Sequence, residues 1–184
     1  MALSSTLYSA QLQIADQDRQ HYQSYSLKVA LHPSELEQRL VARLLAWSLF
    51  ADPDLKFGKG LSSSDEPDIW LHHAHGDIAH WIEIGEADAS RLKKASRMAD
   101  QVTLLVHTPS QAIWWQKQAT AIRVLDNVRV LAIAPDALAA LSEDLPRQIR
   151  WQVTISEGTL YVSHDDRMFE VPVSALQPIH FPSA

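Results

Sequence analysis

Cysteine is absent from this chain of 184 residues, which excludes disulfide bonds and thiolate metal sites. Long hydrophobic runs are absent as well. No stretch approaches the roughly 18–20 consecutive apolar residues of a membrane-spanning helix, so we expect no membrane partner. The N-terminal residues lack a basic segment followed by an apolar block, and we therefore predict no secretory signal. These absences favour a cytoplasmic protein.

An excess of positive charge is also missing. The chain has 16 Lys and Arg residues against 22 Asp and Glu, which gives a net charge of −6. A protein that holds nucleic acid on a broad basic surface is usually basic, so the composition disfavours that class. A local basic groove stays open as an alternative, because Arg91, Lys93, Lys94 and Arg97 cluster in the sequence.

The overall composition is that of an ordinary globular protein, 46% hydrophobic and 21% charged. The length favours one domain over residues 1–184.

Alternation of apolar and polar residues over 5–15 and 22–31 predicts an N-terminal antiparallel hairpin. Apolar residues at helical spacing predict a helix that begins near His32. Ser34 with Glu37 three residues later is typical of a capping box at that start.

The second half of the chain alternates between strands and helices. Two apolar runs that flank a turn predict a hairpin, and their large apolar residues on both faces indicate central strands. A strand–helix–strand–helix–strand order over 78–134 implies parallel pairing. We therefore expect an α/β or α+β fold with a mixed central sheet flanked by helices and with N- and C-terminal hairpins. The expected segments are strands at 68–73, 77–86, 101–107 and 128–134, helices at 89–100, 109–122 and 135–142, and a hairpin over 149–173.

The stretch 67–86, PDIWLHHAHGDIAHWIEIGE, contains two acids that such a hairpin brings together. A tight turn at its centre pairs Trp70 with Trp81 and Asp68 with Glu83, all on one face. Opposite Cβ atoms lie roughly 4.5–5.5 Å apart, so two like charges there repel. They need a cation, a shared proton or an opening to water. A divalent metal is a natural partner for carboxylate oxygens, and simple solvation at the strand ends is the alternative.

Four histidines in the same stretch suggest a zinc site at first sight. Zinc favours three or four convergent ligands. In the predicted hairpin His72 faces Ala79, and His72 and His73 point to opposite faces. His75 lies in the turn, and His80 lies away from the acids. The spacing therefore favours a solvated loop over a histidine metal site.

Several separated motifs resemble those of the YaeQ family, and the similarity runs over essentially the whole chain. This resemblance implies a variant of the PD-(D/E)XK nuclease fold, in which helices flank a mixed sheet. The motifs are HPSE (32–35), DEPDIW (65–70), WIEIGE (81–86), RLKKA (91–95) and IWW (113–115).

The resemblance also implies a site. Pro67-Asp68 matches the Pro-Asp of the nuclease motif, Glu83 matches its second acid, and Glu35 matches a glutamate on the preceding helix. In that reading Glu35, Asp68 and Glu83 hold Mg²⁺ or Mn²⁺, which polarises a phosphate and activates water. Glu86 is a further candidate ligand.

The chain departs from the motif at Gly85, where the nuclease motif has a lysine. In some variants of the fold the basic residue comes from the following helix, where Arg91 and Lys94 share a face; Lys94 is the first choice. Two functions follow: a divalent-metal-dependent phosphodiesterase acting on nucleic acid, or a catalytically inactive nuclease-like fold that binds nucleic acid or a protein as a regulatory module. The motif favours the first function, and the missing lysine and the negative charge favour the second.

Overall fold

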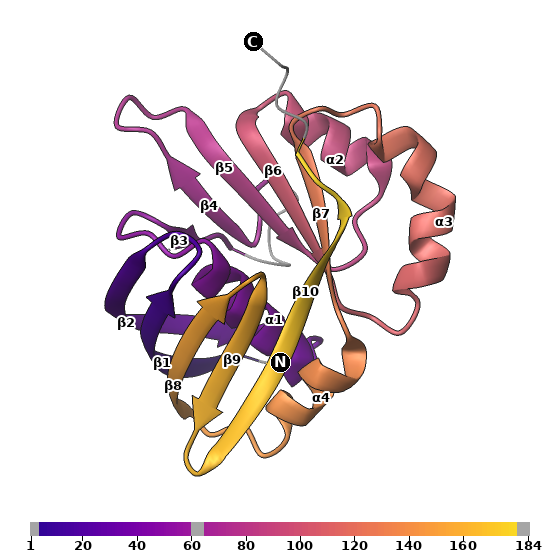
Figure 1. Cartoon of the computed structure of the whole chain (residues 1–184). Helices are drawn as coiled ribbons and strands as arrows, with labels where there is room; N and C mark the ends of the chain where they lie inside the picture. The colour runs from indigo at the N-terminus through magenta and orange to yellow at the C-terminus, as the bar shows by residue number, and fades with distance from the viewer. Residues whose placement is uncertain (1–3, 60–64, 180–184) are drawn as a thin grey trace. The chain divides into compact units, whose positions relative to one another are not determined.

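The computed structural model describes residues 4–59 and 65–179. Backbone contacts divide the chain into two compact units, and we describe each by itself. The first comprises Met1–Ala51 and Ala134–Val173, and the second comprises Asp52–Ile133 and Ser174–Ala184. The single domain expected from the sequence stays a prediction. Figure 1 shows the order of the elements along the chain.

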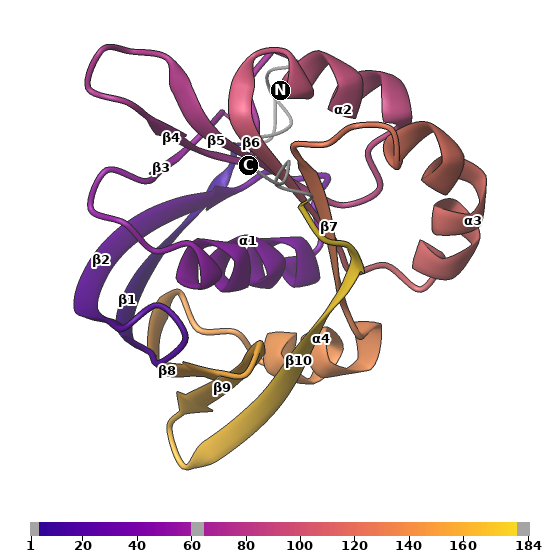
Figure 2. The ribbon, with the colours of Figure 1, turned by 45° about the horizontal axis from the view of Figure 1, so that its top comes forward.

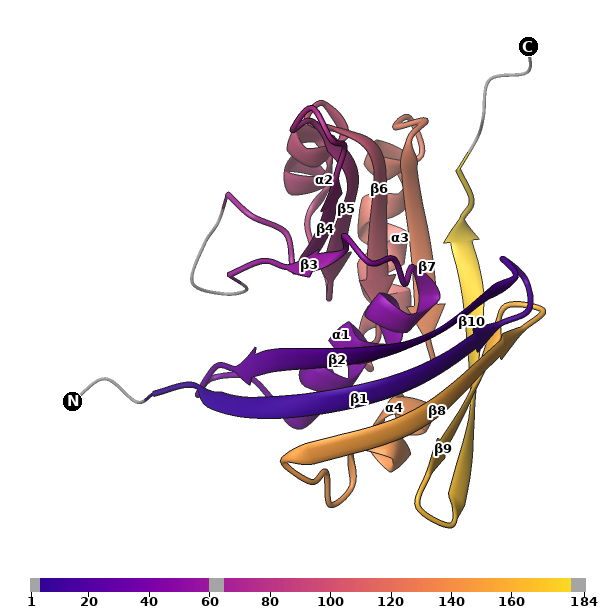
Figure 3. The same cartoon turned by 90° about the vertical axis from the view of Figure 1, so that its left-hand side faces the viewer.

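The first unit contains a mixed sheet with strands in the order β2-β1-β8-β9-β10. β1 and β2 pair antiparallel over their full lengths, which confirms the N-terminal hairpin. β8 lies parallel to β1, and β8, β9 and β10 then form an antiparallel meander, which confirms the C-terminal hairpin and adds a strand to it. Figure 3 shows β2, β1 and β8 running side by side. The bounds are β1 Thr6–Asp16, β2 His21–Leu31, β8 Gln148–Ser156, β9 Thr159–His164 and β10 Arg167–Gln177.

One face of this sheet carries the core of the first unit. Alternate residues of β1 are buried, and helices α1 (Glu37–Leu49) and α4 (Pro135–Ser142) lie over that face (Figure 2). Trp47 of α1 is 1% exposed and meets Tyr25 edge to face, with 4.6 Å between ring centroids. Ser9, Gln11 and Gln13, between the buried residues of β1, are exposed, so the sheet has one apolar and one exposed polar face. The buried residues of β1 are Tyr8, Ala10, Leu12, Ile14 and, at the end of the strand, Asp16.

The helix α1 begins at Glu37, so the start expected near His32 is wrong and Ser34 with Glu37 does not form a capping box. Both side chains have other partners. The Glu37 carboxylate accepts a hydrogen bond from the Tyr8 hydroxyl at 3.0 Å, and the Ser34 hydroxyl bonds to His32 Nδ1 at 2.6 Å. The side chain of Tyr8 on β1 therefore binds the Glu37 carboxylate, which a capping box would need at the start of the helix.

The second unit contains strands in the order β7-β6-β5-β4-β3. β3, β4 and β5 pair antiparallel, whereas β5, β6 and β7 pair parallel with a helix in each crossover, as the alternating order predicts. The helix expected over 89–100 ends at Ser96, because β6 begins at Ala99. The bounds are β3 Lys56–Phe57, β4 Ile69–His72, β5 Ile78–Ile84, α2 Ala89–Ser96, β6 Ala99–Val106, α3 Gln111–Ile122 and β7 Val128–Ile133.

Both helices of the second unit pack on one face of its parallel strands. Leu92 of α2 and Ile122 of α3 are fully buried in the same apolar cluster as Trp81 of β5. Glu83, two residues after Trp81, therefore points to the helix-covered face. The opposite face is buried as well, as Ile82 and Leu105 show, which confirms the prediction of central strands.

The described residues thus form a mixed α+β fold with mixed sheet pairing and four helices. The PD-(D/E)XK assignment stays a prediction. Within the described part of the chain, no helix has both the length and the apolar character needed to span a bilayer.

Candidate functional site

The hairpin of β4 and β5 sets the positions of the two candidate acids. Trp70 pairs with Trp81 as predicted, and their rings meet edge to face with 6.5 Å between centroids. A bulge between Leu71 and His72 shifts the last pair, so His72 pairs with Ile78 and the expected pairing with Ala79 is wrong. The bulge lies toward the turn and leaves the register at the other end of the hairpin unchanged.

Asp68 lies directly before β4 and is 3% exposed. Ile69 pairs with Ile82, so the register extended by one residue puts Asp68 beside Glu83. The Asp68 carboxylate accepts a hydrogen bond from the backbone N–H of Ile84 at 2.8 Å, and its carbonyl accepts one from the N–H of Gly58 at 2.9 Å. Backbone groups on both sides therefore fix this acid.

Glu83 is 8% exposed, and side chains hold both of its carboxylate oxygens. Arg91 Nε donates to Oε1 at 2.8 Å, and the indole Nε1 of Trp81 donates to Oε2 at 2.9 Å. Arg91 also donates to the carbonyl of Glu66 at 3.1 Å and lies over the Trp81 ring, 6.0 Å from its centroid. Arg91 of α2 thus supplies a positive charge next to the two acids, through its ion pair with Glu83.

Lys94, the first choice from the sequence, contacts a different acid. Its ammonium group donates to exposed Asp65 at 3.0 Å. That hydrogen bond is the main cause that lowers the pKa of Asp65 below its ordinary value. The structure therefore brings Arg91, and not Lys94, to the acids. Lys93 is exposed on the same helix, and Arg97, directly after the last helical residue, is exposed as well.

The backbone conformation at Gly85 explains why glycine, and not the lysine of the nuclease motif, is present at this position. Its φ is +105°, a conformation that residues with a side chain rarely adopt. A Cβ at this position would meet no atom within 4 Å, so space is not the obstacle. The N–H of Gly85 donates to the carbonyl of Leu105 at 2.8 Å, which ties this conformation to β6. The backbone conformation thus disfavours a lysine at this position.

Glu35 belongs to the first unit, in the turn before α1. Its carboxylate is almost fully buried and pairs with Arg39 at 3.1 Å and with Arg43 at 3.3 Å. It also accepts a hydrogen bond from the N–H of His32 at 2.7 Å. These contacts give Glu35 a structural role at the start of α1, and its role as a metal ligand stays a prediction. Glu86 of the second unit accepts hydrogen bonds from the Thr108 and Ser110 hydroxyls.

Three of the four histidines in the stretch 67–86 have polar partners in the structure. His73 bonds to Asp100 at 2.6 Å, His75 lies 3.3 Å from Asp77, and His80 bonds to the Thr103 hydroxyl at 2.8 Å. Within residues 4–59 and 65–179, no three His, Asp or Glu side chains cluster as metal ligands. A metal at this site would thus rest on the two acids, Asp68 and Glu83.

Asp88 caps α2 and so fixes the helix that delivers Arg91. Its carboxylate accepts the backbone N–H of Arg91 at 2.8 Å and the Ser90 hydroxyl at 2.7 Å. The backbone hydrogen bond is the main cause that lowers the pKa of Asp88. The stabilisation is therefore complete above the unfolded pKa of about 3.9 and is lost as the pH falls through the lower folded value.

We expect Asp88→Ala to lower the free energy of unfolding by about 1 kcal/mol at neutral pH. The cost should shrink as the pH falls below about 4, because the protonated carboxyl caps less well. Denaturant unfolding at several pH values measures both effects. Asp88→Asn is the control, since Asn caps about as well as Asp and should cost little at pH 7. A cost for Asp88→Ala that does not change with pH would contradict this role.

Sequence reasoning missed two contributors to the site. The shared face of Trp81 and Glu83 follows from their spacing, but the indole hydrogen bond to Glu83 does not. Gly58 carries no sequence signal that points to the site. It supports Asp68 only through the close approach of two backbone segments, which is a tertiary feature.

Comparison with known proteins agrees with the motifs. The family model described as YaeQ protein matches residues 1–173. The "Uncharacterized protein YaeQ" of Escherichia coli (strain K12) is 39% identical over 178 residues, which cover 96% of this chain and 98% of that protein. The crystal structure of YaeQ protein from Xanthomonas axonopodis pv. citri has a TM-score of 0.91 at 37% identity and covers 95% of this chain and 99% of its own. The YaeQ protein structure from Pseudomonas syringae has the same TM-score at 40% identity, over 95% and 97% of the two chains. The chain therefore belongs to the YaeQ family.

Proposed function

We propose that this chain is a divalent-metal-dependent phosphodiesterase that acts on nucleic acid. The observation that carries the proposal is the combination of two buried acids, Asp68 and Glu83, at adjoining strand ends with Arg91 of the next helix directly on Glu83. Carboxylates can hold a divalent metal that polarises a phosphate and activates water, and a basic residue can stabilise the charge that develops.

The donor set fits Mg²⁺ or Mn²⁺. Mg²⁺ is usually held by one or two carboxylates together with waters and substrate phosphates, and Asp68 and Glu83 provide two carboxylates. When bound, the metal would act as a Lewis acid on a phosphate oxygen and lower the pKa of a bound water. The Ile84 N–H and the Trp81 indole hold the two carboxylates in fixed orientations.

Arg91 would replace the lysine that Gly85 excludes. A guanidinium group binds phosphate oxygens through two parallel N–H donors, so Arg91 can exchange its bond to Glu83 for one to a phosphate. Lys93 and Arg97 on the outer surface of α2 would attract the same polyanion. Only these local charges favour nucleic acid, since the net charge of the chain is −6.

The test is calorimetric titration with Mg²⁺ and Mn²⁺, followed by cleavage of a mixed panel of DNA and RNA and of the generic diester bis(p-nitrophenyl) phosphate. We expect metal-dependent heat and cleavage in the wild type. Both should be lost in Glu83→Gln and in Asp68→Asn, which keep the size of each side chain. Glu170→Gln, an exposed acid on β10, is the control and should keep both. No metal-dependent heat and no cleavage in the wild type would reject the proposal.

One observation favours a second function, a nuclease-like fold that binds nucleic acid or a protein as a regulatory module without cutting it. Both Glu83 oxygens already have protein donors, so Arg91 can serve as a permanent internal cation. In that case the wild type gives no heat with Mg²⁺, whereas Arg91→Gln, which frees Oε1, gives a measurable signal. The enzyme hypothesis predicts heat in both proteins and loss of cleavage in Arg91→Gln.

A further inference from the structure

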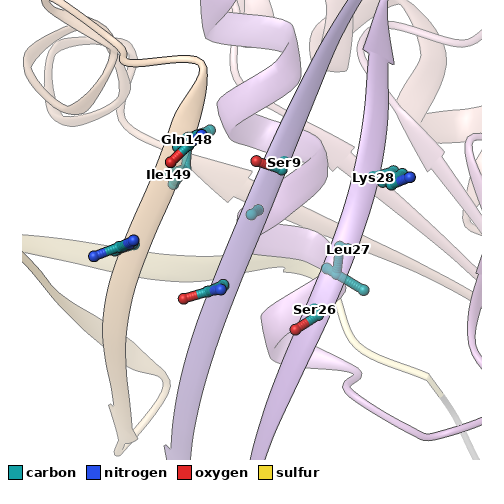
Figure 4. A pocket seen from close by; sticks show the side chains of 9 residues that line it. Ser9, Ser26, Leu27, Lys28, Gln148 and Ile149 are labelled. Atoms are coloured by element: carbon teal, nitrogen blue, oxygen red, sulfur yellow. The ribbon is translucent and has the colours of Figure 1, made fainter.

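The exposed face of the sheet in the first unit carries a depression of about 300 Å³ over β1, β2 and β8. Six polar side chains line it together with three apolar residues, of which Ala10 and Ile149 are buried and Leu27 is partly exposed. Figure 4 shows Ser9 between Lys28 on one side and Gln148 on the other. The polar residues are Ser9, Gln11, Ser26, Lys28, Gln148 and Arg150.

The strand register arranges these residues in two rows across the sheet. Lys28 pairs with Ser9, which pairs with Gln148, and in the next row Ser26 pairs with Gln11, which pairs with Arg150. Lys28 and Arg150 are therefore two strands and two residues apart. Strand spacing and rise put their Cα atoms about 12 Å apart. The two cations stand at opposite corners of a patch with hydroxyl and amide groups between them.

Lys28 and Arg150 differ from the cations of the same unit that form ion pairs with carboxylates. Arg19 pairs with Asp16, and Arg39 and Arg43 pair with Glu35. Among the described residues no carboxylate forms an ion pair with Lys28 or Arg150, and no acid lines the depression. In a chain of net charge −6, this patch is a local concentration of uncompensated positive charge. An anionic partner would complete it.

The lining selects among anionic partners. Small-molecule sites are mostly concave and apolar, whereas six of the nine residues that line this depression are polar, which suits a polymer that passes across it. Ser and Gln side chains both donate and accept hydrogen bonds. They therefore match sugar hydroxyls and phosphates together better than a run of carboxylates, which only accepts. No aromatic ring lines the patch, so base stacking has no part in it.

We propose that this face, centred on Lys28 and Arg150, binds the sugar–phosphate backbone of single-stranded nucleic acid without sequence preference. The inference rests on the proposed function for its class of ligand, but it concerns a different surface. The Cα atoms of Lys28 and Arg150 lie about 12 Å apart, and side chains of a strand stand roughly perpendicular to the sheet, so the two cations are placed to contact separate phosphates of one strand.

The test measures binding of a fluorescein-labelled oligouridylate, whose riboses carry free 2′-hydroxyls, by fluorescence anisotropy, in EDTA and at several salt concentrations. We expect Lys28→Gln/Arg150→Gln to weaken binding about tenfold at low salt. It should also make the negative slope of log K against log salt shallower by about 1.4, or roughly 0.7 for each lost single-strand phosphate contact. Lys117→Gln/Arg123→Gln, an exposed pair in the second unit with the same charge change, is the control and should keep affinity and slope.

Equal affinity in wild type and Lys28→Gln/Arg150→Gln, or no binding in the wild type, would overturn the inference. Equal displacement of the oligonucleotide by polyglutamate would also overturn it, because the face would then recognise charge alone. None of these results decides the proposed function. That function is measured separately by metal titration and by cleavage of bis(p-nitrophenyl) phosphate, a diester too small to need this face.

Discussion

Replacing Arg91 by Gln is expected to lower the free energy of unfolding by about 2–3 kcal/mol at neutral pH. The variant leaves the Glu83 carboxylate, with 10% of its side chain exposed, without its positive partner. Removing one member of a fully buried ion pair typically costs about 3–5 kcal/mol. The Arg91 side chain is 29% exposed, so water can reach the vacated position and reduce the cost. Urea unfolding of wild type and variant measures the difference.

A double-mutant cycle separates the lost pair from other effects of the substitution. Arg91→Gln/Glu83→Gln removes both charges, so it should recover most of the stability that Arg91→Gln loses. Arg91 also bonds to the Glu66 carbonyl, and that loss is common to both variants and cancels in the cycle. Additive costs for the two single substitutions would show that Arg91 and Glu83 are not coupled.

The sequence predicted the part of the site that depends on strand periodicity. Apolar residues on both faces identified β5 as a central strand, and a residue spacing of two put Trp81 and Glu83 on one face. The pairing of Trp70 with Trp81 then followed from the turn. These features are local, so a short stretch of sequence contains all the information that they need.

Choices between neighbouring residues could not be predicted, because tertiary contacts decide them. Arg91 and Lys94 share a helix face, and spacing gives no reason to prefer either. The structure separates them because Arg91 lies over the Trp81 ring and reaches Glu83, whereas Lys94 reaches Asp65. In the same way, Glu37 fits a capping box in sequence, but Tyr8, 29 residues earlier, takes its carboxylate.

Gly58→Ala is expected to disturb the other acid, Asp68, from a position outside the site. A Cβ at residue 58 would lie 2.0 Å from the backbone carbonyl oxygen of Pro67, far inside van der Waals contact. Neither partner is a flexible side chain, so a backbone segment must move. Gly58 follows β3, and its N–H bonds to the Asp68 carbonyl. We expect a loss of about 3 kcal/mol, at the upper end of the range for overpacking.

The displacement should be visible at a specific atom as well as in the stability. The amide proton of Ile84 bonds to the Asp68 carboxylate, so its NMR signal should shift in Gly58→Ala. Gly76→Ala is the matched control. Its φ of +102° makes the substitution strained, but no atom lies within 4 Å of the new Cβ. It should cost about 1–2 kcal/mol and leave the Ile84 signal unchanged.

An unshifted Ile84 signal in Gly58→Ala, with stability close to that of the wild type, would show that the approach of Gly58 to Pro67 does not position Asp68. A shift together with loss of metal-dependent heat would link this backbone contact to the proposed site, because Gly58 itself has no side chain to contribute.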